Sequence, residues 1–389
     1  MGNIETIAVL LLIAAVVAIV ARRLRVPYSI GLVMTGVALA VLPFSPNIEL
    51  TKQLIFSAFL PPLIFEGAFQ LRWSELRRDL PVILVLATVG VLISAAVTAA
   101  GIRWFTGWTW IAALAFGVLI AATDPVSVIA TFKDAAVHGR IRLLVEAESL
   151  FNDGTAAVAF TIVLTAASGQ SAGAVGIMKT LVIVVLGSLV CGVAVAALAL
   201  LLAGTTDDHL VEITITTVAA YGSFLLAEHF HLSGVLATLA AGLIVRNVGH
   251  LAMAVENRKA VEKFWAYGAF VANSLIFLLI GIRVAHQNYR FVLLPALIAI
   301  VVVLLGRALA IYPLSLLFIR TTRAVRLRHQ HILFWGGLRG ALALALALGL
   351  PEQIPQRQEI IAVAFAVVAF SILVQGLTIS PLLRYANQP

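Results

Sequence analysis

Apolar runs long enough to cross a lipid bilayer recur along the whole chain. A hydrocarbon core of about 30 Å needs roughly 20 consecutive apolar residues in a helix. Because the backbone finds no water there, only helices and closed barrels span a membrane, and runs of this length favour helices. We therefore predict an all-α polytopic membrane protein with about thirteen transmembrane helices, at residues 5–21, 28–44, 51–70, 80–101, 108–131, 143–168, 174–203, 211–228, 232–248, 261–283, 292–319, 330–350 and 359–382.

Composition excludes other classes of protein. Hydrophobic residues make up 62% of the 389 residues and charged residues 11%, which is more apolar surface than a soluble core of this size could bury. The formal charge of +8 could indicate nucleic acid, but the basic residues lie in short loops between apolar runs, without interleaved aromatics. We expect membrane lipid as a partner and no nucleic acid.

The basic residues also predict the topology. Of the 26 Lys and Arg residues, eighteen fall on one side of the predicted spans, six on the other, and two, Arg307 and Arg339, within spans. Cytoplasmic loops carry the excess of positive charge. We therefore expect the N-terminus outside, the C-terminus in the cytoplasm, and a multi-pass location in the cell membrane.

No soluble domain is expected, so residues 1–389 form a single transmembrane domain. Leu342–Leu348 alternates leucine with alanine, but an open strand cannot satisfy its backbone in lipid, so we predict a helix. The eight histidines lie in loops or near span ends and do not indicate a zinc site. Neither a nucleotide-binding loop nor a nucleophile triad is found, so we expect no enzyme activity and no cofactor.

Polar residues gather at the start of the sixth predicted span. Glu148 to Asp153 precede an uncharged run at residues 154–167. A charge near the bilayer centre costs roughly 3 kcal/mol on insertion scales, so a charge retained there normally acts on an ion or proton pathway. On a helical wheel the polar side chains cover one arc of roughly 160°. We predict that this arc is the wall of an ion site and comprises Glu148, Ser149, Asn152, Asp153 and Thr155.

Two predicted spans contain residues that break helices. Thr123, Asp124 and Pro125 interrupt the fifth span, where the proline removes a backbone donor and disfavours helical angles before it. Gly336, Gly337 and Gly340 surround Arg339 in the twelfth span. Broken helices in matching positions of two halves indicate the midplane site of a transporter. We expect inverted repeats, in which spans four to six match spans eleven to thirteen and each repeat contributes one broken, crossing helix.

The residue types suggest separate roles. One carboxylate that binds either a proton or a cation couples the two by competition, and Asp153 is our first candidate, with Asp124 second. The hydroxyls of Ser149 and Thr123 offer the oxygen ligands that hard cations prefer. The predicted Na+ site therefore consists of Asp153, Ser149, Thr123 and Asp124.

A basic residue within a span could neutralise Glu148. We expect Arg339 to pair with it as a structural unit.

Three residues have alternative interpretations. Asp124 could instead cap the broken helix. Glu66 in the third span could be an acid in the cytoplasmic funnel or a helix-end group that reaches the interface. Arg307 is expected to be a structural partner for the end of a broken helix rather than an ion ligand.

Five motifs in order resemble those of monovalent cation/proton antiporters of the sodium/proton exchanger branch, the prokaryotic NhaP type. They are LPPLIFEG at residues 60–67, TDP at 123–125, ESLFNDG at 148–154, SGVLA at 233–237 and GGLRGA at 336–341. The resemblance implies the sodium/proton antiporter fold. It also implies a homodimer in which a six-helix core moves against a dimerisation scaffold. We place the core at about residues 80–168 and 292–382, and the scaffold at about 5–44 and 174–283.

The resemblance also assigns roles to residues. It implies cation ligands at Thr123, Ser149 and Asp153, beside a structural cluster of Glu148, Asn152 and Arg339. The Asn152–Asp153 pair resembles the electroneutral members of the family. We therefore predict 1:1 exchange of Na+ or Li+ for H+ by alternating access, serving pH homeostasis. K+/H+ exchange is an alternative, and a cation or proton channel is a second one, although pore-type carbonyl loops are absent from the sequence.

Overall fold

The computed structural model describes residues 3–24, 26–41, 50–124, 128–129, 132, 139–168, 173–287 and 292–386. Every secondary-structure element within these ranges is a helix, which confirms the predicted all-α class. Nine of the described helices are long and apolar enough to cross a membrane. Each of the thirteen predicted ranges contains helix, while the number of membrane crossings stays a prediction.

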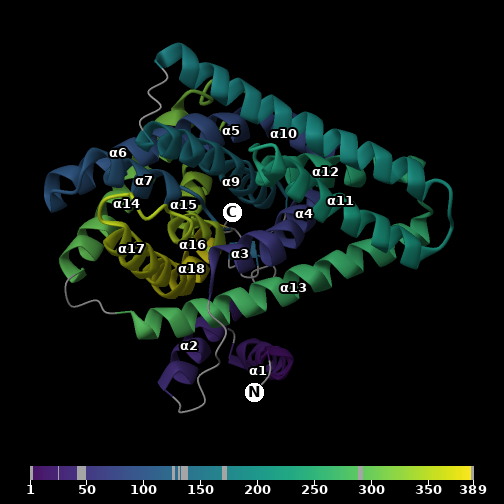
Figure 1. Ribbon diagram of the computed structural model, residues 1–389, viewed down its shortest axis with the longest axis horizontal. Helices are drawn as coiled ribbons and strands as arrows, with labels where there is room; N and C mark the ends of the chain where they lie inside the picture. The colour runs from purple at the N-terminus through teal and green to yellow at the C-terminus, as the bar shows by residue number, and fades with distance from the viewer. Residues whose placement is uncertain are drawn as a thin grey trace.

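The helices form two groups that lie side by side (Figure 1). One group contains the longest helices and is called here the long-helix group. Its elements are α1 (Asn3–Leu24), α2 (Tyr28–Val41), α3 (Lys52–Leu54), η1 (Ile55–Phe59), α4 (Leu60–Gln70), α10 (Ala174–Ala203), α11 (His209–His229), α12 (Gly234–Val248), η3 (Gly249–Leu251) and α13 (Val255–His286).

The second group contains both interrupted helices and is called here the broken-helix group. Its elements are α5 (Trp73–Val85), η2 (Leu86–Gly90), α6 (Val91–Thr106), α7 (Trp110–Leu119), α9 (Arg140–Ala167), α14 (Leu293–Leu316), α15 (Leu327–Trp335), α16 (Ala341–Leu348), α17 (Arg357–Phe370), η4 (Ser371–Gln375) and α18 (Gly376–Ala386). Leu342–Leu348 is helical, as predicted, because a helix satisfies its own backbone hydrogen bonds, and its small alanines allow neighbouring helices to approach closely.

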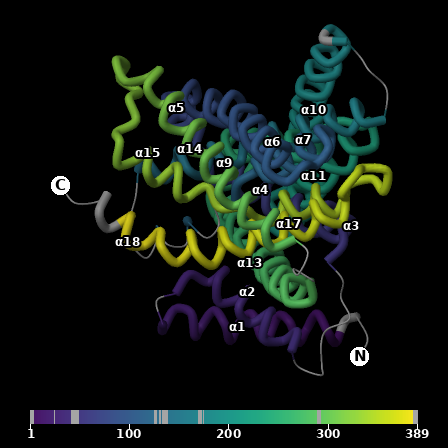
Figure 2. Tube along the Cα trace, turned by 90° about the vertical axis from the view of Figure 1, so that its left-hand side faces the viewer, coloured from purple at the N-terminus to yellow at the C-terminus, as the bar shows by residue number. Residues whose placement is uncertain are grey.

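The helices α1, α2 and α13 pack together along one side of the molecule (Figure 2), and α2 and α13 are in close backbone contact. A Cβ atom at Gly36 of α2 would collide with the carbonyl oxygen of Leu278 in α13. A Cβ at Gly281 of α13 would in turn collide with the carbonyl of Val33. Small residues give membrane helices this proximity because dispersion contacts, rather than the hydrophobic effect, drive their association.

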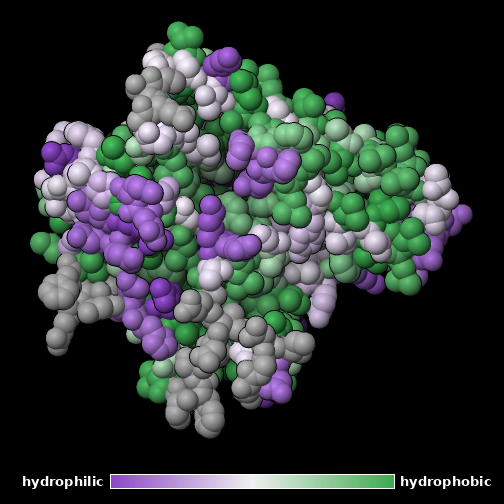
Figure 3. All heavy atoms as spheres, viewed as in Figure 1, coloured by the Kyte–Doolittle hydropathy of each residue, from purple (hydrophilic) through white to green (hydrophobic). Residues whose placement is uncertain are grey.

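The surface agrees with a protein surrounded by lipid. On the face shown in Figure 3, hydrophobic side chains cover much of the long-helix group. Hydrophilic side chains gather on the same face near α14, α15 and α17, which are labelled in Figure 1. The α10 helix illustrates this, since Val190 is 68% exposed and Leu201 74% exposed. Apolar residues this exposed need lipid around them.

Candidate functional site

Two interrupted helices cross at the centre of the broken-helix group. α7 ends at Leu119, and an extended segment reaches Asp124, whose backbone N–H donates to the carbonyl of Leu338 at 2.7 Å. Leu338 lies in the extended segment between α15 and α16. The two predicted helix breaks are therefore confirmed, and they contact each other. Pro125 lies outside the described residues.

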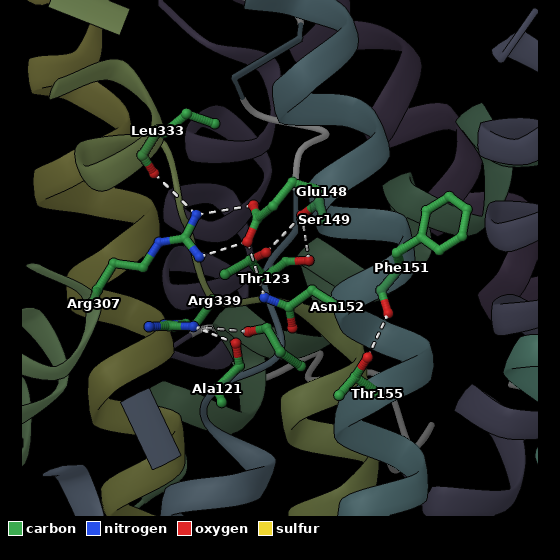
Figure 4. A network of polar contacts seen from close by, with 11 residues as sticks. Ala121, Thr123, Glu148, Ser149, Phe151, Asn152, Thr155, Arg307, Leu333 and Arg339 are labelled. Atoms are coloured by element: carbon green, nitrogen blue, oxygen red, sulfur yellow. Dashed lines mark hydrogen bonds and ion pairs between the residues drawn. The ribbon is translucent and has the colours of Figure 1, made fainter. Parts of the chain in front are cut away.

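An arginine contacts the C-terminal end of each interrupted helix (Figure 4). Arg339 donates from Nη1 to the carbonyls of Ala121 at 2.7 Å and Ala122 at 3.3 Å, just beyond α7. Arg307 donates from Nη2 to the carbonyl of Leu333 in α15 at 3.0 Å. The last carbonyls of a helix lack partners within it and carry its negative dipole end, so a cation stabilises them. Arg307 therefore lies at the end of a broken helix, where it was predicted, while its role stays a prediction.

The predicted pairing of Glu148 with Arg339 is wrong, because Glu148 pairs with Arg307. Nη1 and Nη2 of Arg307 donate to the two carboxylate oxygens of Glu148 at 2.7 and 2.9 Å. Their side chains are only 6% and 2% exposed. Nδ2 of Asn152 also donates to Glu148, at 3.4 Å. Arg339 is engaged by the backbone of the α7 break, so the charge of Glu148 is balanced from α14 instead.

Thr123 and Ser149 bring two hydroxyl groups together across the break. The Ser149 hydroxyl donates to the backbone carbonyl of Thr123 at 2.7 Å, and the two side-chain oxygens also lie 2.7 Å apart. Since the serine proton is used on the carbonyl, the Thr123 hydroxyl is the donor of the second bond. Both residues are buried, and the structure confirms that the predicted hydroxyl pair is adjacent.

Asp153 follows Ser149 by one turn of α9 and lines a cavity of about 160 Å³. The Oδ1 atom of Asp153 is buried and has no hydrogen-bond partner among the residues that the structure describes. Thr123 and Asp124 belong to the same cavity wall. A buried carboxylate oxygen without a partner carries a large desolvation cost, which a bound proton or cation would remove.

Asp124 lies against the N-terminus of α16. Gly340 is the N-cap residue of this helix, and a Cβ atom there would overlap the carboxylate of Asp124. A helix N-terminus favours negative charge. The position thus agrees with both interpretations of Asp124, as a cavity acid and as a helix-end group.

The opposite wall of the cavity belongs to the long-helix group. Glu66 of α4 lines it and accepts a hydrogen bond from Nε2 of Gln70 at 2.9 Å. Asn273 of α13 lines the same cavity. The cavity therefore lies between the two helix groups, with Glu66 on one wall and Asp153 on the other.

Comparison with known proteins now decides the family. The model of the family described as "Sodium/hydrogen exchanger, transmembrane" matches residues 9–385. The chain belongs to this family. Its members are transporters that span the membrane several times, not enzymes.

Several antiporters are similar along nearly the entire chain. The Na(+)/H(+) antiporter NhaS2 of Synechocystis sp. is 38% identical over 97% of this chain and 69% of its own length. The Na(+)/H(+) antiporter NhaP of Pseudomonas aeruginosa is 35% identical over 95% of this chain and 93% of its own.

A solved structure shares the fold. The sodium proton antiporter MjNhaP1 of Methanocaldococcus jannaschii superposes with a TM-score of 0.81 over 99% of both chains, at 20% identity. The NhaP-like resemblance and the sodium/proton antiporter fold are confirmed.

Two charged residues that line the cavity were not predicted from the sequence. Arg142 and Glu146 line the cavity and form an ion pair at 2.6 Å. With Ser149 and Asp153 they follow the spacing i, i+4, i+7, i+11, which places all four on one face of α9. That spacing could have revealed them, although Arg142 is also one of the eighteen basic residues that predict the topology.

Thr155 does not belong to the ion site. Its hydroxyl donates to the carbonyl of Phe151 in its own helix at 3.1 Å, and both residues point away from the Glu148 cluster (Figure 4). Thr155 instead lines a second, apolar cavity against α10 and α12. The predicted polar arc of α9 was therefore too wide, because threonine can satisfy its hydroxyl on its own backbone.

Proposed function

We propose that this chain is a secondary active antiporter that exchanges Na+ or Li+ for H+ across the cell membrane. The observation that carries the proposal is the buried Oδ1 of Asp153, which lies in a cavity between the two helix groups and has no hydrogen-bond partner in the described part of the chain. A single carboxylate can bind a proton or a monovalent cation but not both. Competition at Asp153 therefore couples the two fluxes.

Oxygen ligands for the cation surround this carboxylate. Thr123 and Ser149 supply hydroxyl oxygens, and Asp124 supplies a second acid in the same wall. Hard cations take such oxygen ligands. The substrate Na+ would lie among these four residues, and Glu66 on the facing wall would attract cations into the cavity.

The Glu148–Arg307 pair supports a stoichiometry of one to one. Glu148 is held by two hydrogen bonds from Arg307, so its carboxylate has a structural partner and is not available to the transported ions. The neighbour of Asp153 is Asn152, a neutral amide. Each cycle then trades one positive charge for another and is electroneutral.

Alternating access would come from movement between the two groups. The cavity wall of α9, α16 and the crossing segments belongs to the broken-helix group, and the wall of α4 and α13 to the long-helix group. We propose that the former is the moving core and that the latter contains the dimerisation scaffold of a homodimer. Arg142, Glu146 and Gln70 lie at the end that the charge distribution assigns to the cytoplasm, so this conformation would face inward, with the N-terminus outside.

The names of the relatives support the choice of ions. NhaS2 of Synechocystis sp. and NhaP of Pseudomonas aeruginosa are both named Na(+)/H(+) antiporters. We extend this exchange to the present chain because its carboxylate, hydroxyls and broken helices occupy one cavity.

Purified protein in liposomes that contain a pH-sensitive dye tests the proposal. Pulses of Na+ and Li+ should each move protons, and the end point should not change when potassium and valinomycin set the membrane potential. A net charge would couple to the potential by about 2.3 kcal/mol per 100 mV and shift that end point. A response to K+ alone would identify a K+/H+ antiporter, and current driven by one ion gradient without counter-ion would identify a channel.

A further inference from the structure

A second cavity lies between the two helix groups, away from the ion site. It has a volume of about 1080 Å³. One wall comes from α5, η2, α6 and α9, and the other from α10 and α12, which lie next to each other in Figure 1. Exposed apolar side chains flank it, among them Leu92 at 56% and Val193 at 43%, so the cavity opens sideways to the surroundings of the helices.

Three of the polar side chains that line this cavity already have hydrogen-bond partners in the protein. The hydroxyls of Thr88 and Thr155 donate to carbonyls of their own helices at 2.6 and 3.1 Å. Asn247 donates to Leu243 at 2.8 Å and accepts from the backbone N–H of Trp73 at 2.7 Å. A buried water needs two to four polar partners, and this wall offers few. The cavity therefore suits hydrocarbon.

The cavity is long enough for an acyl chain. Its lining along α5, η2 and α6 runs from Trp73 to Leu92. At 1.5 Å per residue this is about 29 Å, close to the whole hydrocarbon core of about 30 Å. One acyl chain of a single leaflet therefore fits inside the cavity with its headgroup at the Trp73 end.

Arg77 lies on the cavity side of α5. Trp73 and Leu84 line the cavity, and Arg77 lies about 20° from Leu84 and about 40° from Trp73 on the helical wheel, so it is on the same side of α5. Arg77 is exposed and forms no ion pair within the part of the chain that the structure describes. Its long side chain can reach from the apolar wall to a headgroup at the rim beside Trp73 and Ser74.

We propose that this cavity binds a phospholipid with an anionic headgroup, with one acyl chain between α9 and α12 and the headgroup at Arg77. The apolar wall accommodates the acyl chain, and the unpaired arginine selects the negative headgroup. The site is separate from the cavity of Asp153, and the proposal does not depend on the exchange activity.

Photo-crosslinking from inside the cavity tests this proposal. A diazirine phenylalanine replaces Phe151, and the protein is reconstituted in vesicles of phosphatidylcholine and phosphatidylglycerol. Mass spectrometry should find phosphatidylglycerol in the adducts about fivefold above its share of the vesicle, since one basic residue near an anionic surface contributes about 1 kcal/mol. The same probe at Phe105, which is 69% exposed, should report the vesicle composition.

Two arginine variants identify the headgroup contact. Arg77→Gln should abolish the enrichment, whereas Arg78→Gln should preserve it, because Arg78 is also exposed but lies 100° further round α5. A photoreactive leucine at Leu243 on the opposite wall repeats the measurement if the probe at 151 disturbs folding. Adducts with water or with protein in place of lipid at both positions, or equal enrichment in the two arginine variants, would overturn the proposal.

Discussion

Replacement of Arg307 by methionine should leave Glu148 as an unpaired charge in the protein interior. Methionine keeps an unbranched apolar stem that reaches as far as the Nε position of arginine, but removes both donors to the carboxylate. The Glu148 side chain is 2% exposed, so water cannot replace the lost partner. Breaking a buried pair in this way costs about 3–5 kcal/mol. We expect a loss of unfolding free energy in this range for Arg307→Met.

A double-mutant cycle measures the pair itself. Glu148→Gln removes the charge that Arg307 balances, so the double variant should lose less stability than the two single variants combined. Contacting residues couple by 0.5–3 kcal/mol. Two hydrogen bonds at 2.7 and 2.9 Å between buried ions place this coupling at the upper end, about 3 kcal/mol.

The assay is unfolding by sodium dodecyl sulfate in mixed micelles, followed by tryptophan fluorescence. The matched control is a second cycle with Arg339→Met, because Arg339 is equally buried but donates to Ala121 and Ala122. Its coupling with Glu148 should be clearly smaller. Additive losses in the Arg307 cycle, or a larger coupling in the Arg339 cycle, would refute the assignment of the ion pair.

Three further outcomes are expected. Gly340→Ala should displace the Asp124 carboxylate, slow the cation-driven pH change in liposomes and lower the stability by about 1–3 kcal/mol. An unaltered transport rate would contradict the contact between Gly340 and Asp124. Gly36→Ala should separate α2 from α13, lower the free energy of unfolding by about 1–3 kcal/mol and so lower the melting temperature in detergent. An unchanged melting temperature would show that the two helices are not in backbone contact. Acidification below the pKa of the shared site should raise the apparent KM for Na+ by about tenfold per pH unit, and a KM independent of pH would exclude competition between Na+ and H+.

The sequence predicted the helices and their interruptions well. Apolar length sets the spans because the bilayer imposes it, and the helix breaks follow from proline and glycine chemistry in otherwise apolar runs. Ser149 and Thr123 lie in different spans, and the family motifs indicated that they meet, as they do at 2.7 Å. These features depend on local chemistry or on a known motif.

The ion-pair partner of Glu148 could not be predicted from the sequence in the same way. Arg307 and Arg339 are both single arginines within apolar runs, and both could neutralise an acid in α9. The choice depends on how α14 and the crossing segment lie in space, which hydrophobic patterning does not determine. Asn273 was missed for a related reason, because one amide in an apolar helix does not reveal which cavity it faces.

The most direct test of the central claim compares two aspartate variants in liposomes that contain a pH dye. Asp153→Asn keeps the size of the side chain but removes its titratable group. Asp208→Asn makes the same change at the exposed N-cap of α11, where asparagine caps equally well. If Asp153 carries both Na+ and H+, a Na+ pulse should produce no pH change with Asp153→Asn and the wild-type change with Asp208→Asn. Undiminished Na+-driven proton movement in Asp153→Asn would contradict the account.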